Sequence, residues 1–369
     1  MDASDALQGM DVLAGLGWND RHATLFASEA PGLVPGRVLS EERGQYLVAS
    51  VSGVGPASAS GRLRHDTELD PGAAWPTVGD WVALEPGTGT EHRLIQRVLT
   101  RRTAVVRRSP GDRKLRSQVL AANVDVVFVV TSVNQEFNVR RLERYVTVAW
   151  ESGATPIILL SKSDLADDLD GFRIAAEAAA PAVEIIAVSA VTHLGIEDVR
   201  AHLGAGRTVV FTGSSGVGKS SIVNALAGEP LLDTGGIRLD DARGRHTTTR
   251  RQLVRLVDGL LIDTPGLREL GVMDGDGLAT AFDDVDRLVT ECRFSDCQHR
   301  SEPGCAVRAA LGSGALDRGR FDAYQKLQRE ANRAALATDA LGRRAERRKW
   351  AIITREVEQH ARMKYGTDR

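Results

Sequence analysis

The chain has 369 residues, which is long for one domain and predicts two or three. With 42% hydrophobic and 26% charged residues it has the composition of a soluble globular protein, and no run of about 18 apolar residues is available to span a membrane. The net charge of −2 excludes a general attraction to nucleic acid, so any basic surface must be local. The acidic N-terminus, MDASDALQGMDV, lacks the apolar segment of a signal peptide, and we expect a cytoplasmic protein without a membrane partner.

Residues 1–35 show few periodic signals, and we expect a short N-terminal extension with one helix there. From residue 36 to 110, short β-type runs follow one another at close spacing, which predicts an all-β barrel or sandwich such as the five-stranded OB-fold. OB-folds commonly bind nucleic acid. Five arginines gather near the end of this region: Arg97, Arg101, Arg102, Arg107 and Arg108. They fit phosphate contacts and a solvated edge strand equally well.

Residues 111–275 are predicted to form a central α/β domain. The segment VDVVFVVTSV at 124–133 is nearly all apolar, as expected for a parallel strand buried on both faces. A crossover helix is expected at 139–152. Further strands are expected at 155–160, 183–188, 207–212, 251–257 and 259–262. This alternation of strands and helices predicts a parallel sheet wrapped by helices.

The predicted strand before residue 213 leads into a glycine-rich turn, GSSGVGKSS, and then into a predicted helix. This run fits the phosphate-binding loop pattern GxxxxGK[ST], whose flanking strand and helix are both present. Backbone N–H groups and the helix N-terminus would hold a polyphosphate, while Lys219 would neutralise the outer phosphates and Ser220 would ligate Mg²⁺. The predicted contacts are Gly213, Ser214, Ser215, Gly216, Val217, Gly218, Lys219, Ser220 and Ser221. A glycine-rich turn without a ligand is the alternative.

Two further segments fit the switch elements of a phosphate-loop GTPase. The tetrapeptide at 263–266 fits DxxG, in which Asp263 would reach Mg²⁺ and the Gly266 N–H would contact the γ-phosphate. Between the two motifs, GRHTTT at 244–249 offers a threonine to complete the Mg²⁺ shell, and Thr248 is our candidate. For any single threonine the alternative is that it only belongs to the segment preceding the next strand and binds no metal.

The segment SKSD follows the predicted strand at 155–160 and resembles the guanine-recognition motif [NT]KxD. Asp164 would accept hydrogen bonds from the two donors that guanine has and adenine lacks, and the Lys162 stem would lie along the base. Serine makes fewer hydrogen bonds than asparagine, which predicts weaker base affinity. The remaining predicted contacts near the base are Ser161, Ser163, Ser189 and Ala190. A surface turn that happens to have this sequence is the alternative.

The order of these motifs is unusual. In the common GTPase order the phosphate loop comes first, whereas here it follows the base-recognition motif, so the predicted domain is circularly permuted. Nucleotide state would then pass from the DxxG segment directly into the C-terminal region.

Residues 276–369 are predicted to form a C-terminal, mostly helical domain. Its three cysteines lie close together with one histidine, and the set Cys292, Cys297, His299 and Cys305 is a complete tetrahedral ligand set for structural Zn²⁺. Buried free cysteines near a histidine are the alternative. A helix-like stretch from 321 to 360 contains the basic segment RRAERRKW, which favours RNA phosphate binding over a solvated helix face.

Taken together, these residues resemble the ribosome small subunit-dependent GTPase A family (RsgA/YjeQ). The resemblance covers residue 36 to the C-terminus. It is based on PTVGDWV at 76–82, GSSGVGKSS, GRHTTT, DTPGLRE at 263–269, CRFSDCQHRSEPGCAV at 292–307 and the permuted order. It implies an OB-fold, a permuted P-loop GTPase domain and a zinc domain, with GTP, Mg²⁺ and Zn²⁺ as cofactors. It also implies a role in late maturation of the small ribosomal subunit, with that subunit and its rRNA as partners and as stimulators of GTP hydrolysis. We expect a monomer.

Leu267 stands where many GTPases have a glutamine that orients the attacking water, and a leucine cannot do this. His246 is our candidate for that role, and Lys219 is the second predicted catalytic residue. Two other functions stay open: an RNA-docking module with incidental nucleotide turnover, and a shift toward ATP caused by Ser161.

Overall fold

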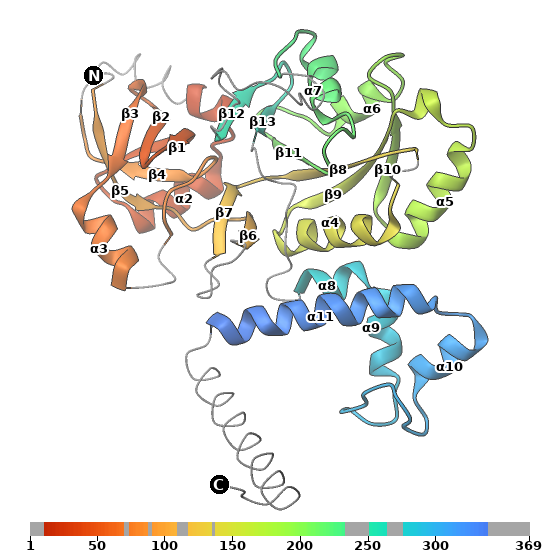
Figure 1. Cartoon of the computed structure of the whole chain (residues 1–369). Coiled ribbons are helices and arrows are strands. Elements are labelled where there is room, and N and C mark those ends of the chain that lie inside the picture. Colours follow the sequence, from red (N-terminus) through yellow and green to blue (C-terminus); the bar gives the residue numbers. More distant parts are fainter. Residues whose placement is uncertain are drawn as a thin grey trace, which may run out of the picture.

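The computed structural model describes residues 11–69, 74–87, 91–108, 117–134, 137–232, 251–263 and 276–338. In Figure 1 a β-barrel and an α/β sheet lie side by side, and the C-terminal helices lie beneath the sheet. This arrangement confirms the predicted fold class of an N-terminal barrel, a central α/β domain and a helical region with a Cys/His cluster. No helix in the described segments has both the length and the apolar character needed to cross a bilayer.

The N-terminal barrel closes because its first strand pairs on both edges. Its strands are β1 (Val34–Glu42), β2 (Gln45–Ser50), β3 (Gly53–Ala59), β4 (Trp81–Leu84) and β5 (Arg93–Val98). Strand β1 pairs with β2 and with β4, while β5 joins β3 to β4. Alternate side chains such as Val48, Val82 and Ile95 fill the interior. Helix α3 (Gly61–Leu69) adds Leu63 to this core.

Among the described residues, the central sheet has six strands in the order β10-β9-β8-β11-β13-β12. They are β8 (Val126–Ser132), β9 (Thr155–Ser161), β10 (Glu184–Val188), β11 (Thr208–Thr212), β12 (Arg251–Arg255) and β13 (Leu260–Asp263). All neighbours are parallel except β12 and β13. From β8 the chain proceeds outward to β9 and β10, whereas from β11 the sheet continues the other way to β13. The strand order therefore reverses between β8 and β11, which is where open α/β sheets bind ligands.

Helices cover both faces of this sheet, because successive residues of each buried strand point to opposite sides. Val127 and Val129 face the core that includes α4 (Val139–Glu151) and α5 (Leu169–Ala179). Val126 and Phe128 face the core that includes α6 (Ile196–Ala201) and α7 (Lys219–Ala227). The near-continuous apolar sequence of β8 follows from this two-sided burial.

The barrel and the sheet are joined into one continuous sheet, which has eleven strands in the part of the chain that the structure describes. Strand β1 continues past the barrel and pairs with β12, with Ser40 opposite Gln252. Beside this seam, Arg37 is only 2% exposed; its guanidinium donates to Thr208 Oγ1 at 2.8 Å and lies 5.0 Å from the Trp81 ring centre. A separate hairpin, β6 (Ala104–Arg108) with β7 (Ser117–Ala122), lies outside the barrel.

The N-terminal segment packs into this junction. Leu13 and Leu16 are buried in the main core, and Trp18 packs edge-on against Trp81 with ring centres 4.9 Å apart. Helix α2 (Asp20–Glu29) is capped at its N-terminus by Asn19, whose side chain accepts a hydrogen bond from the backbone N–H of His22. Residues 11–29 therefore pack onto the rest of the structure.

Several arginines near the barrel bond within the protein. Arg101 forms a two-pronged ion pair with the fully buried Asp80, both contacts being 2.7 Å. Arg102 pairs with Asp125, and Arg97 donates to the backbone carbonyl of Glu29. Arg101 is therefore largely buried, whereas Arg97 and Arg102 make these contacts while still exposed to solvent.

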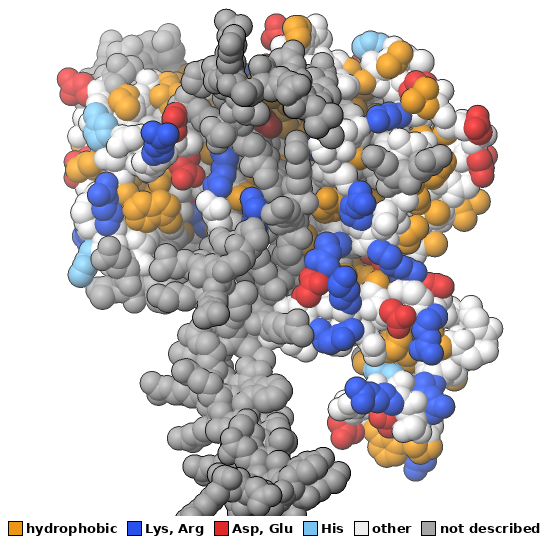
Figure 2. All heavy atoms as spheres, in the orientation of Figure 1, with side chains coloured by type: hydrophobic (Ala, Val, Ile, Leu, Met, Phe, Trp, Pro, Cys, Tyr) orange, Lys and Arg blue, Asp and Glu red, His pale blue; other side chains and the backbone are white. Residues whose placement is uncertain are grey.

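Of the C-terminal helices, α8 (Asp276–Ala281) and α11 (Arg318–Thr338) pack against α4, while α9 (Asp283–Thr290) contacts α8 and α10 (Ala306–Ser313). Arg320 fixes this contact, because its guanidinium binds Glu143 of α4 at 3.2 Å and Asp284 of α9 at 2.6 Å. Glu143 is 1% exposed, so this pair is buried. In Figure 2, Lys and Arg side chains gather where the C-terminal helices meet the sheet domain, with Asp and Glu among them.

Candidate functional site

The phosphate loop occupies the predicted place at the end of β11 and the start of α7. Gly213 has φ +142°, and a Cβ there would lie 2.2 Å from the Val130 carbonyl oxygen of the adjacent strand. Gly218 has φ +93° and directly precedes the first helical residue, Lys219. Both positions therefore require glycine, because a side chain would clash or strain the backbone. The glycine at 213 is thus explained by the close approach of the loop to β8, and the glycine at 218 by the turn into α7.

Lys219 lies folded over the loop. Its Nζ donates to the carbonyl oxygens of Gly213, at 2.9 Å, and of Ser214, at 2.5 Å. A phosphate group is a stronger partner for an ammonium ion than a neutral carbonyl is. The position is therefore suited to a lysine that exchanges these carbonyls for the outer phosphates of a nucleotide.

Ser161 contacts the phosphate loop. It ends β9 and is 1% exposed, and its Oγ lies 2.5 Å from the carbonyl oxygen of Val217 and 3.3 Å from that of Thr131. A hydroxyl has one proton to donate, and the shorter distance assigns it to Val217. The Ser161 hydroxyl therefore contacts the phosphate loop, and its contact with a base stays a prediction.

The rest of the predicted base-recognition motif lies beside Ser161. Lys162 has a left-handed backbone (φ +59°), and a 3₁₀ turn follows over Ser163–Leu165, in which Asp164 is exposed. Strand β10 pairs in register with β9, Val188 opposite Ser161, so that Ser189 and Ala190 emerge next to this turn. The Ser189 hydroxyl oxygen accepts from the backbone N–H groups of Val191 and Thr192 and holds the second turn in place.

Asp263 is the last residue of β13, on the other side of the phosphate loop from the base-recognition motif. Burial raises the pKa of its carboxyl group, and among the described residues no cation pairs with it. A divalent cation would lower that pKa and offset the free-energy cost of burying a charged carboxylate, so the residue fits a Mg²⁺ site. Ser220, the other predicted Mg²⁺ ligand described here, lies in the first turn of α7.

Several predicted residues lie outside the described parts of the chain. They are the switch residues His246, Thr247, Thr248 and Thr249, together with Gly266 and Leu267. The basic segment at 343–350 also lies outside them.

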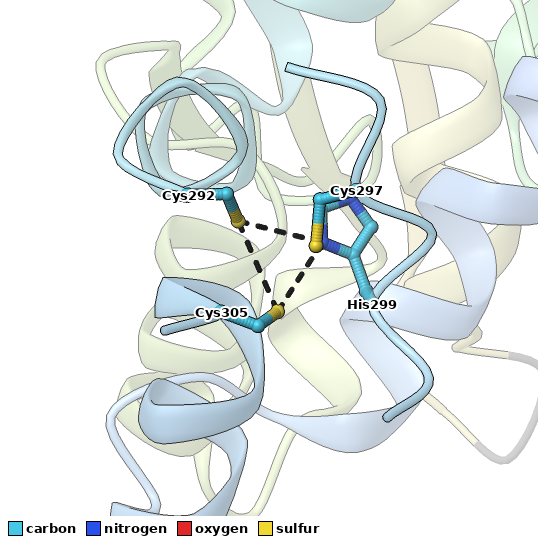
Figure 3. Close-up of side chains that lie close together, drawn as sticks. All are labelled: Cys292, Cys297, His299 and Cys305. Atoms are coloured by element: carbon cyan, nitrogen blue, oxygen red, sulfur yellow. Dashed lines mark hydrogen bonds between the residues drawn. The ribbon is translucent and has the colours of Figure 1, made fainter. Parts of the chain in front are cut away.

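The four predicted zinc ligands converge on one point (Figure 3). Cys292 follows α9, Cys305 caps the start of α10, and Cys297 and His299 come from the loop between them. The Sγ atoms of Cys292 and Cys305 are 3.8 Å apart, and each lies 3.6 or 3.5 Å from His299 Nδ1.

These separations match a tetrahedral metal site. With zinc–sulfur bonds of about 2.3 Å and zinc–nitrogen bonds of about 2.0 Å, tetrahedral ligands are separated by roughly 3.8 Å for two sulfurs and roughly 3.5 Å for sulfur and nitrogen. Burial lowers the pKa of His299, which keeps the imidazole neutral and able to ligate. The donor set and its spacing therefore fit a closed structural zinc site.

Comparisons with known proteins agree with these motifs. The sequence profile of the RsgA GTPase family matches residues 98–273. The chain is 42% identical over 333 residues to the small ribosomal subunit biogenesis GTPase RsgA 1 of Oceanobacillus iheyensis, covering 88% of this chain and 92% of that protein. The chain belongs to the RsgA GTPase family.

Further relatives extend this result over most of the chain. The RsgA protein of Streptomyces coelicolor is 44% identical over 355 residues, which are 95% of this chain and 94% of that protein. Among solved structures, YjeQ from Thermotoga maritima has a TM-score of 0.58 at 26% identity and covers 80% of this chain and 96% of that chain. The circularly permuted GTPase YloQ has a TM-score of 0.57 at 24% identity over 81% of this chain and 95% of that chain, a likeness of fold. The resemblance identified from the sequence and the predicted enzyme class, a GTPase, are thereby confirmed.

The structure also places one residue at the RsgA phosphate loop that the sequence did not single out. Arg141, in the first turn of α4, donates from Nη1 to Ser214 Oγ at 2.5 Å. Arg141 shares the start of this helix with Arg140 and Arg144, and nothing in the amino-acid sequence distinguishes it from these two arginines. Only the adjacency of β8 and β11 brings the start of α4 to the loop.

Proposed function

We infer that this RsgA-family protein binds GTP·Mg²⁺ at the carboxyl ends of β9, β10 and β11 and hydrolyses it while bound to the small ribosomal subunit. The observation that supports this most is the position of the permuted motifs. The turns after β9 and β10 and the phosphate loop after β11 emerge from the same edge of one parallel sheet. The relatives' names supply the subunit and its biogenesis as the setting.

Within this site, each part has a distinct task. Asp164 selects guanine, Lys219 neutralises the outer phosphates, and Asp263, Ser220 and a threonine of 247–249 hold Mg²⁺. His246 orients the attacking water. We expect hydrolysis to be slow in the isolated protein and to be stimulated by the small subunit and its rRNA, with the protein acting as a monomer in the cytoplasm.

We propose that Cys292, Cys297, His299 and Cys305 hold one structural Zn²⁺. The ion would tie the ends of α9 and α10 together and keep the loop between them in a fixed conformation. Metal analysis of the purified protein should give close to one zinc per chain. A value far below one equivalent would show that these cysteines are free thiols.

The decisive experiment measures GTP and ATP turnover by the full-length protein with and without purified small ribosomal subunits. We expect GTP to be hydrolysed in preference to ATP, and the rate to rise when small subunits are added. Large subunits serve as the control and should not stimulate. A flat rate with small subunits, combined with tight nucleotide-dependent binding to them, would instead support an RNA-docking module with incidental turnover.

A further inference from the structure

Helix α4 has three arginines at its N-terminal end, and two of them are neutralised by carboxylates. Arg140 pairs with Glu143 and with Asp317, both at 2.7 Å. Arg144 binds the two carboxylate oxygens of Glu330 at 2.7 and 2.8 Å. These pairs attach α4 to the segment before α11 and to α11 itself, and their charges are compensated within the protein.

Arg141 differs from its two neighbours. It is exposed, and its guanidinium donates to the neutral hydroxyl of Ser214 in the phosphate loop. Among the described residues no carboxylate pairs with it, although Arg140 and Arg144 both have such partners. One full positive charge is thus left uncompensated next to the loop.

A second positive charge lies at the same residue. The Lys219 ammonium contacts the backbone carbonyl oxygen of Ser214, while the Arg141 guanidinium contacts its side-chain hydroxyl. Arg141 lies in the helix after β8 and Ser214 in the loop after β11, the two strands between which the strand order reverses. Two cations at one loop residue attract a polyanion, and a guanidinium can bind two phosphate oxygens at once.

The position of Arg141 indicates which phosphate it would meet. The N-terminus of α7 and its backbone N–H groups are suited to the inner phosphates, whereas the loop lysine serves the outer ones. Arg141 shares Ser214 with that lysine and approaches from α4, on the sheet face opposite α7. It is therefore placed beyond the helix N-terminus, on the side of the outer phosphates.

We propose that Arg141 leaves Ser214 when GTP binds and contacts the terminal phosphate, so that it favours the triphosphate over the diphosphate. The proposal rests on the inferred function of this loop as the GTP site. Because GDP lacks the group that Arg141 would contact, removal of the guanidinium should affect the two nucleotides differently.

The test compares dissociation constants for GDP and for a non-hydrolysable GTP analogue, using full-length wild-type protein and the Arg141→Ala variant. An exposed charge-assisted contact of about 1 kcal/mol corresponds to a factor of roughly five. We therefore expect the analogue to bind about fivefold more weakly to Arg141→Ala, with GDP affinity changed by less than about twofold.

Arg140→Ala is the matched control. It removes the same charge at the neighbouring position, but Arg140 faces Glu143 and Asp317 and not the phosphate loop. Its ratio of analogue to GDP affinity should equal that of the wild type. Equal weakening of GDP and analogue in Arg141→Ala, no weakening, or the same selective loss in Arg140→Ala would each overturn the proposal. Failure of the wild-type protein to bind either nucleotide would instead contradict the proposed function, so the two failures are distinguishable.

Discussion

Replacement of Ser161 by alanine tests whether this residue supports the phosphate loop or recognises the base. The substitution removes a buried hydroxyl that donates to the Val217 carbonyl oxygen at 2.5 Å and leaves the backbone of β9 unchanged. A hydrogen bond of this kind contributes about 1 kcal/mol, and a short, buried one lies at the upper end of the range, about 1.5 kcal/mol. If the loop needs this bond to keep its phosphate-binding conformation, nucleotide affinity falls by roughly fivefold to tenfold.

Because the contact is with the loop, the loss should be the same for GDP and GTP. The preference for GDP over ADP should stay at its wild-type value. The assay is titration of the variant with fluorescent GDP, GTP analogue and ADP, beside an Asp164→Ala variant that should lose the guanine preference. A Ser161→Ala protein that binds GDP normally, or that loses selectivity for guanine without a general loss of affinity, would refute this reasoning.

Three further predictions concern stability and pH. Cys305→Ser removes a buried predicted zinc ligand, so bound zinc and the thermal midpoint should both fall; unchanged metal content would contradict the zinc assignment. Arg320→Met leaves the buried carboxylate of Glu143 with Arg140 as its remaining cationic partner, and the free energy of unfolding measured in urea should fall by about 3 kcal/mol. The double variant with Glu143→Gln should recover part of this free energy. A loss below about 1 kcal/mol would refute the reasoning. Burial, followed by the charge of Arg37, lowers the pKa of His22 to about 4. The folded state then binds fewer protons than the unfolded chain between pH 6.5 and 4, so stability should fall as the pH drops through this window, and less so in His22→Phe; identical pH profiles would exclude His22 as the cause.

The sequence predicted the sheet well because its signals are local. The apolar run around Phe128 is typical of a strand buried on both faces. The glycines at 213 and 218 have positive φ angles that disfavour other residues, and a Cβ at 213 would also clash with β8. The Cys/His spacing likewise restricted the C-terminal site to four residues, which the structure brings within 4.8 Å of one another.

What the sequence could not supply depends on pairings between distant segments. The contact of Ser161 with Val217 requires that the turn after β9 and the phosphate loop face each other. Arg141 reaches the phosphate loop because β8 lies next to β11. The N-terminal segment gave few signals because its order comes from packing of Leu13 and Trp18 on other elements and not from its own periodicity.

The pairing of β1 with β12 also has a consequence for how the chain acquires its structure during synthesis. The five barrel strands lie within the first hundred residues and can close on themselves while the rest of the chain is still being made. The far end of β1, at Ser40 and Glu41, must then wait for Arg251 and Gln252. Contacts of such long sequence separation form late, because the loop between them must first be ordered. The newly made barrel therefore presents an open strand edge until the GTPase sheet has formed, and an unpaired strand edge can pair wrongly with another strand.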